Sequence, residues 1–176
     1  MIKLHPRHRF VVIDVETTGL SPRYGDRVIE IGALAIENGT VMEEYSTLID
    51  TKRAINRNAR QVHGITREML IGKPKPEEIM PEFEKFIRNS ILIAHNARFD
   101  MGFIRHEFHR QKLPFNYQYI CTLEMSQERL PHLPNHKLDT VYRHLMGATG
   151  DILKQQHRAL ADSRMVAAVW LAMEGK

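Results

Sequence analysis

The chain has 176 residues, of which 43% are hydrophobic and 26% are charged, a composition typical of a globular protein with a sizeable core. Its formal net charge of +4 favours a polyanionic partner. The single cysteine, Cys121, excludes an internal disulfide, and no apolar run has the length of a signal-peptide core or a membrane span. We therefore expect a single domain over residues 1–176 that works in the cytoplasm and not in a membrane.

Three strands are predicted in the first third of the chain. The β-branched apolar run that begins at Phe10 predicts a buried strand. A second apolar run covers 27–37, and Asn38-Gly39 after it is a strong hairpin signal that leads into a third strand at 41–49. The first three strands are therefore expected to form an antiparallel meander.

Helices dominate the rest of the chain. A broken helical pattern begins at Asn56, with a loop or helix cap at 62–66, and the Lys-Pro repeat at 73–76 interrupts the chain before the first long helix. Strands followed by alternating strands and helices are typical of a mixed α/β sheet covered by helices. We expect helices at about 77–88, 97–111, 122–130, 138–146 and 158–174, and short strands at 91–94 and 117–121.

Asp14 and Glu16 form a pair of carboxylates at the end of the first strand. Residues at i and i+2 of a strand project from the same face, so these two side chains lie together. Like charges on a buried strand repel and resist desolvation, and a divalent cation between them would relieve both effects. The alternative is a strand end that runs into solvent with two surface acids. Glu30 interrupts the second strand, and it either approaches this pair or faces solvent.

Two further acids fall on apolar helix faces. Asp100 lies between the directions of Phe103 and Ile104, toward the sheet. The alternative for Asp100 is an acid that interacts with the helix dipole in the first turn. In the last helix, Asp162 lies in line with Val166, which is a core position near the helix start.

His157 precedes Asp162 by five residues, an offset that does not share a helix face with it. We therefore expect His157 on the loop before the last helix. There it is either an ordinary N-terminal cap or a movable base beside a metal site.

Taken together, these acids indicate a metal site more strongly than any one of them alone. Three elements each place a carboxylate where burial disfavours it. Together the four acids have the ligand chemistry for two hard divalent cations, a standard arrangement for cutting phosphodiesters. They are Asp14, Glu16, Asp100 and Asp162.

Three segments resemble the exonuclease motifs of the DEDDh 3′→5′ exonucleases, in the form of the proofreading epsilon subunit of bacterial DNA polymerase III. They are D-V-E-T-T-G at 14–19, H-N-A-R-F-D at 95–100 and H-R-A-L-A-D at 157–162. V-H-G-I-T at 62–66 and H-K-L-D at 136–139 are also similar to that group. The match spans nearly the whole chain, in order and at plausible spacings.

The resemblance implies a ribonuclease H-like fold, with a mixed five-stranded sheet of three antiparallel and then two parallel strands, flanked by helices. It implies His157 as the general base, and two Mg²⁺ or Mn²⁺ ions held by Asp14, Glu16, Asp100 and Asp162. By the same matching, the terminal nucleotide would be held by Thr17, Thr18, Gly19, Leu20 and His63.

Individual roles within this set differ. The resemblance makes Leu20 a wedge against a base and brings the backbone near Thr17 to the 3′-hydroxyl, while Gly19 allows another backbone to approach closely. The alternative for His63 is a polar residue that caps the next helix. Asn96 is counted with the substrate-binding residues, and we expect it to act as a helix N-cap that places Asp100.

The resemblance implies a metal-dependent 3′→5′ exonuclease that shortens single-stranded DNA from its 3′ end, in proofreading or repair. One alternative is an exoribonuclease of the same superfamily, and another is a non-catalytic nucleic-acid-binding module on this fold. Polymerase-bound members have a further C-terminal segment, which is not visible before Lys176. The expectation is therefore either a stand-alone enzyme or an isolated catalytic domain with a polymerase or repair protein as partner.

Overall fold

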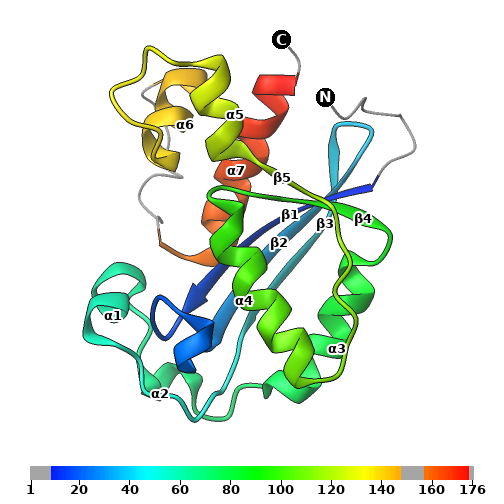
Figure 1. Cartoon of the computed structure of the whole chain (residues 1–176), viewed down its shortest axis with the longest axis vertical. Helices are drawn as coiled ribbons and strands as arrows, with labels where there is room; N and C mark the ends of the chain where they lie inside the picture. Colours follow the sequence, from blue (N-terminus) through cyan, green and yellow to red (C-terminus); the bar gives the residue numbers. More distant parts are fainter. Residues whose placement is uncertain (1–8, 148–156, 175–176) are drawn as a thin grey trace.

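The computed structural model describes residues 9–147 and 157–174, which form a five-stranded sheet with the strand order β3-β2-β1-β4-β5 (Figure 1). β1 (Arg9–Thr17) is central, and β2 (Val28–Glu37) and β3 (Thr40–Leu48) follow it as antiparallel strands. β4 (Ser90–Ala94) and β5 (Tyr119–Cys121) add in parallel on the other side. The predicted mixed sheet is confirmed.

The β2–β3 hairpin has the geometry that its sequence predicts. Asn38 has φ 52° and Gly39 has φ 75°, so both turn residues occupy the left-handed region. Two consecutive positive φ values are characteristic of the type I′ turn, whose twist matches that of the flanking strands. Glu37 therefore pairs directly with Thr40 across the turn.

Helices flank the sheet, and Figure 1 shows α5 and α6 beside α7. Most bounds agree with the expected ones to within about two residues. In the segment 62–66, expected as a loop or helix cap, Val62 and His63 are the last residues of a helix, and Gly64 after them has the φ of 70° that is typical of a helix C-cap. The helices are α1 (Arg57–His63), α2 (Arg67–Leu70), α3 (Pro76–Ile87), α4 (Ala97–Arg110), α5 (Thr122–Arg129), α6 (Leu138–Met146) and α7 (Ala159–Glu174).

The two faces of the sheet are covered by different helices. Odd-numbered residues of β1, such as Val11 and Ile13, pack in one cluster with α3 and α4. Even-numbered residues, Phe10 and Val12, pack in a second cluster with Val166 and Trp170 of α7. Because strand side chains alternate between faces, the even positions that follow along β1 also face α7.

Glu30 and Cys121 are both buried. Glu30 is 3% exposed and pairs with Arg158, so it is not the solvent-facing residue that the sequence left as an alternative. Cys121 is a buried core residue at the end of β5. None of the described helices combines the length and the apolar character that crossing a membrane requires.

Candidate active site

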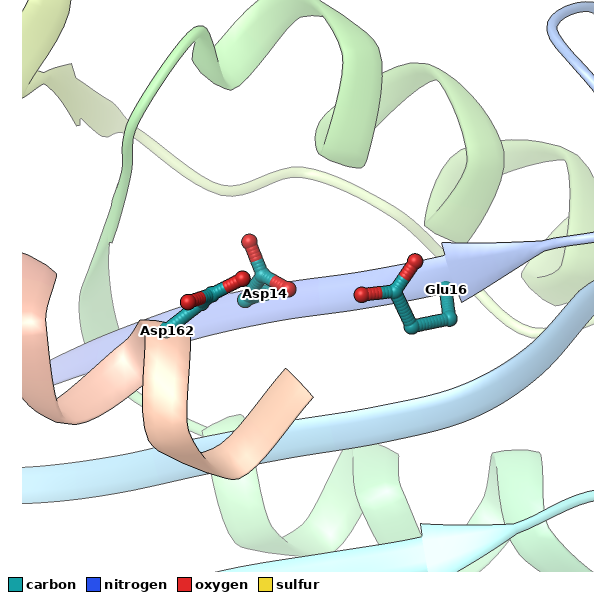
Figure 2. A group of neighbouring side chains, drawn as sticks. All are labelled: Asp14, Glu16 and Asp162. Carbon is teal, nitrogen blue, oxygen red and sulfur yellow. The ribbon is translucent and has the colours of Figure 1, made fainter. Parts of the chain in front are cut away.

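Three of the four predicted acids come together between the sheet and α7. Asp14 and Glu16 project from β1 and Asp162 projects from α7 into the same space (Figure 2). One carboxylate oxygen from each residue lies within 4.8 Å of the others, and all three side chains are half-buried. This is a group of hard oxygen ligands with the spacing that a divalent cation requires.

A glycine in β2 allows α7 to approach this closely. Gly32 lies opposite Asp14 in the antiparallel register, and a Cβ there would collide with the backbone of Ala159 and Leu160. The Ser163 hydroxyl also donates a hydrogen bond of 2.8 Å to the Gly32 carbonyl. The first turn of α7 therefore rests on the backbone of β2, one strand away from Asp14.

Asp100 approaches from the opposite face. It lies in the first turn of α4, is 3% exposed and accepts a hydrogen bond of 3.2 Å from the backbone N–H of Val15. The β1–β4 pairing ends at Val12 and Ile93, so β1 continues beyond β4 and leaves this edge free for the carboxylate. The structure thus places Asp100 between Asp14 and Glu16 along the strand, outside the group of three.

Burial raises the pKa values of all four acids. It raises the pKa of Glu16 to about 8, with Asp162 as the next cause, and it raises the pKa of Asp100 to about 8. The pKa of Asp14 lies well above its usual range because of burial and then the charge of Asp100. Burial also raises the pKa of Asp162. Burial and the neighbouring acids thus disfavour the ionised form of the cluster.

These observations fit a divalent cation. The four side chains are carboxylates, the ligands that Mg²⁺ and Mn²⁺ prefer, and they come from elements far apart in sequence. Burial and then the neighbouring acids raise the pKa values of Asp14 and Glu16, so the ionised acids are unfavourable without a further positive charge. A cation at this place would restore the ionised state of the acids and offset their repulsion.

His157 lies where the sequence places it, just before α7. It is exposed and has φ 66°, and its backbone N–H donates a hydrogen bond of 3.0 Å to Oδ2 of Asp162. This bond uses the main chain, so the capping interaction at this helix end does not engage the imidazole ring. The ring remains accessible for proton transfer, the second of the two roles that the sequence left open.

The Thr17–Leu20 turn is fixed by a network around Asp26. The Thr18 side chain donates to Asp26 Oδ1 at 3.3 Å, and the Ser21 backbone N–H donates to Oδ2 at 3.1 Å. A Cβ on Gly19 would collide with the Asp26 carboxylate. Gly19 therefore makes room for a side chain of its own loop, not for another backbone as expected. Leu20 is 85% exposed at the tip of this turn.

His63 is buried at the end of α1 and uses both ring nitrogens. Nδ1 accepts from the Ile65 backbone N–H at 3.0 Å, so Nε2 carries the proton and donates to the Thr17 carbonyl at 3.2 Å. Burial lowers the pKa of His63, which favours this neutral form. In this structure His63 supports the turn at Thr17, and direct contact with substrate stays a prediction.

Asn96 occupies the N-cap position of α4 but does not cap it with its side chain. Its φ of 61° and ψ of 48° are left-handed, and this orientation leaves the side chain exposed. The expected side-chain cap is therefore wrong, because N-cap bonds form from an extended backbone. The Asn96 carbonyl instead accepts a hydrogen bond from Phe99 at 2.9 Å.

A groove next to Asn96 includes residues that the sequence analysis did not single out. His95 donates from Nε2 to the His136 carbonyl at 2.8 Å, and its Nδ1 lies 3.0 Å from the Thr122 hydroxyl. The first of these bonds joins two of the matched motifs, 95–100 and 136–139, and this was the signal available in the sequence. The groove has a volume of about 460 Å³ and is lined by His95, Asn96, Leu123, Gln127, His136, Lys137 and Leu138.

Comparison with known proteins gives one family. A family model described as an exonuclease (RNase_T) matches residues 11–170. The chain is 43% identical over 163 residues to the PolC-type DNA polymerase III of Thermotoga petrophila, covering 92% of this chain and 12% of that protein. It is 34% identical over 167 residues to the 3′-5′ exonuclease DinG of Bacillus subtilis, covering 94% of this chain and 17% of that protein. The chain spans less than a fifth of the length of these relatives.

Solved structures agree with this result. Exonuclease X in complex with 5′ overhanging duplex DNA matches with a TM-score of 0.72 and 27% identity, over 94% of this chain and 91% of that one. Exonuclease I matches with a TM-score of 0.82 over 97% of this chain and 41% of that one, and at 17% identity it shows the fold alone. The expected ribonuclease H-like fold is confirmed. Since the family match runs from β1 to α7, and so through all three acidic motifs, the chain belongs to the exonuclease family.

Proposed function

We propose that this exonuclease domain hydrolyses single-stranded DNA from the 3′ end and releases nucleoside 5′-monophosphates. The observation that carries the proposal is the convergence of Asp14, Glu16 and Asp162 beside an exposed His157. An acidic cluster alone binds cations, whereas an acidic cluster with an accessible base is equipped for hydrolysis.

The four acids would hold two Mg²⁺ or Mn²⁺ ions. Asp14, Glu16 and Asp162 supply oxygens to one space, and Asp100, which accepts from the Val15 N–H, would supply a ligand from the α4 side of β1. The ions, when bound, would supply activation of water and stabilisation of charge on the phosphoryl oxygens. A ring nitrogen of His157 would take the proton of the attacking water.

The turn at 17–20 would hold the terminal nucleotide. The backbone near Thr17 is held by His63 and by the network around Asp26, and Leu20 presents an exposed apolar side chain beside it. A rigid apolar tip next to a metal site suits a wedge against the last base. The fixed backbone suits recognition of the 3′-hydroxyl.

The groove at His95 would receive the strand upstream of the scissile phosphate. Val12 of β1 pairs with Ile93 of β4 in parallel, and Asp14 and His95 each come two residues later. Asp14 and the groove at His95 therefore lie at the same edge of the sheet. Apolar side chains and imidazoles line the groove, and the exposed Lys137 lies beside them. Stacking surfaces combined with a cation are typical of single-strand binding without sequence readout.

The names of the relatives favour DNA as substrate and a polymerase context. The PolC-type polymerase points to proofreading, and DinG is named as a 3′-5′ exonuclease. A domain of either kind would work in the cytoplasm. The rival is an exoribonuclease of the same superfamily, which would have to accept the 2′-hydroxyl at the terminal sugar.

Matched DNA and RNA oligonucleotides test the proposal. With a 5′ label, we expect a ladder that shortens from the 3′ end of DNA with Mg²⁺ or Mn²⁺ and no product with EDTA. A 3′-phosphate should block the reaction. Robust cutting of a circular single strand by the pure protein would contradict an exonuclease, and faster loss of RNA than of DNA would favour the exoribonuclease.

A further inference from the structure

Glu30 of β2 is a buried acid without a role in the function proposed above. It lies directly opposite Glu16 in the β1–β2 register and is 3% exposed. Two carboxylates opposed across an antiparallel pair destabilise it. An acid at this position therefore needs a compensating interaction, and the structure shows which residue provides it.

Glu30 binds the chain just before α7 through two residues. The Nη2 atom of Arg158 lies 2.6 Å from Glu30 Oε1, and its Nε lies 3.1 Å from both carboxylate oxygens. The backbone N–H of Ala159, the first residue of α7, donates to Oε2 at 3.2 Å. Glu30 thus holds both a guanidinium and the start of a helix, which is a bidentate and geometrically specific arrangement.

The residues that Glu30 holds lie between two groups of the proposed mechanism. Arg158 directly follows His157, and the His157 N–H donates to Asp162 across the same turn. The contact of α7 with Gly32 is made by the backbone of Ala159 and Leu160 and fixes the depth of the helix on the sheet. The Glu30 carboxylate adds a restraint on Arg158 and on the Ala159 N–H, the two residues that join His157 to the helix.

We propose that Glu30 is a positioning residue that acts through Arg158 to place His157 and Asp162 against Asp14 and Glu16. Its catalytic consequence rests on the proposed exonuclease function. A shift of about 1 Å in a reacting group costs on the order of 10²-fold in rate, so the loss of this restraint lowers turnover more than substrate affinity.

The chain contains a matched control for this pair. Glu44 of β3 and Arg164 of α7 form another ion pair between the sheet and the same helix, with 2.5 Å between Oε2 and Nη2. Both side chains are exposed, and Arg164 is the sixth residue of α7, whereas Arg158 directly precedes the helix. Glu44→Ala therefore removes a carboxylate–guanidinium link to the same helix and leaves the bonds to Arg158 and Ala159 in place.

The experiment compares Glu30→Ala, Glu30→Gln and Glu44→Ala in steady-state digestion of a DNA oligonucleotide. We expect kcat of Glu30→Ala to fall about 10²-fold with little change in KM, while Glu44→Ala stays at wild type. Glu30→Gln keeps an acceptor for the Ala159 N–H and should lie between them. Equal kcat for folded Glu30→Ala and Glu44→Ala would overturn the proposal.

Two further arms separate positioning from other roles. Combining Glu30→Gln with Arg158→Met should lose no more than the worse single variant, because the pair acts as a unit. Losses that multiply would mean that Glu30 acts directly and would overturn the proposal.

The rise in melting temperature on adding Mn²⁺ should be smaller in Glu30→Ala than in wild type and Glu44→Ala, and an undiminished rise would also overturn it. If the wild type degrades no nucleic acid, the proposed function fails, while the Mn²⁺ comparison still decides the placement of Asp162.

Discussion

Gly32 of β2 lies directly opposite Asp14 of β1, and it is the residue on which the start of α7 rests. This pairing connects the packing of the fold with the geometry of the site. The glycine removes the side chain that would separate α7 from the sheet, and Asp162 reaches Asp14 for that reason. A glycine in a strand interior is otherwise unfavourable, and it often marks a close backbone approach.

Gly32→Ala should displace α7 and remove most of the activity. The new Cβ would collide with the backbone of Ala159 and Leu160, which has no flexible side chain to move aside. We expect a stability loss of about 1–3 kcal/mol, typical of overpacking, together with a fall in kcat of the folded fraction. Gly102→Ala in α4 is the control, because nothing lies within 4 Å of its Cβ position and alanine favours a helix. Denaturant melts of both variants measure the difference, and equal stabilities would contradict this account.

Asp14→Asn should abolish metal-dependent digestion and leave the metal-free protein at least as stable as wild type. The substitution removes one charge from a cluster in which burial and neighbouring acids already disfavour ionisation. We expect an activity loss on the order of 10²-fold or more. Asp26→Asn is the contrast, because the wild-type Asp26 carboxylate accepts hydrogen bonds from Thr18 and Ser21. We expect the melting temperature of the Asp26→Asn variant to fall. An Asp14→Asn protein that melts well below wild type would mean that Asp14 is structural.

The metal-free protein should lose stability as the pH rises. The folded pKa values of Glu16 and Asp100 are raised to about 8, whereas these groups titrate near ~4 in an unfolded chain. Between these values the folded state holds protons that the unfolded state has released, so the free energy of unfolding decreases with increasing pH. We expect the melting temperature in EDTA to be lower at pH 8.5 than at pH 5.5 by about 4 °C or more. Saturating Mg²⁺ or Mn²⁺ should flatten this dependence, and a melting temperature that rises over the same range in EDTA would refute the prediction.

Lys137→Gln should lower the affinity for single strands by reducing the electrostatic contribution to binding. Lys137 lies in the groove at His95, and a phosphate contact there would release counterions. We expect the slope of log affinity against log salt to decrease by about 0.7, the value for one contact with a single strand. Lys85→Gln on α3 is the matched control, because Lys85 is exposed but lies outside the groove. Titrations in the Asp14→Asn background avoid digestion, and equal slopes for both variants would exclude the groove as the path of the strand.

The fold could be predicted from local patterns because each pattern has a direct physical cause. The β-branched run of β1, the Asn38-Gly39 turn and the alternation of strands with helices predicted the antiparallel meander and the mixed sheet, and the carboxylates at even positions of β1 were expected on one face. The convergence of Asp14, Glu16 and Asp162 follows from the same patterns, because a carboxylate on an apolar face needs a partner.

The supporting contacts were not predictable, because they depend on register and on side-chain direction. Glu30 had a solvent-facing alternative that only the pairing with Glu16 and Arg158 removes. Gly19 was expected to admit a backbone, but it admits the side chain of Asp26. Asn96 was expected to cap α4, but its left-handed backbone turns the side chain away. Each of these depends on atoms that lie far apart in sequence or on one backbone torsion.

The role of His157 gives the sharpest kinetic prediction. The ring is exposed, and the bond to Asp162 is made by the backbone N–H, so removing the ring leaves this helix end intact. His157→Ala should lose about 10²–10⁴-fold in single-turnover rate, the usual contribution of a general base, with an unchanged melting temperature. His157→Gln preserves polarity but not basicity and should be equally slow. Near-normal turnover by folded His157→Ala would remove the histidine from the mechanism.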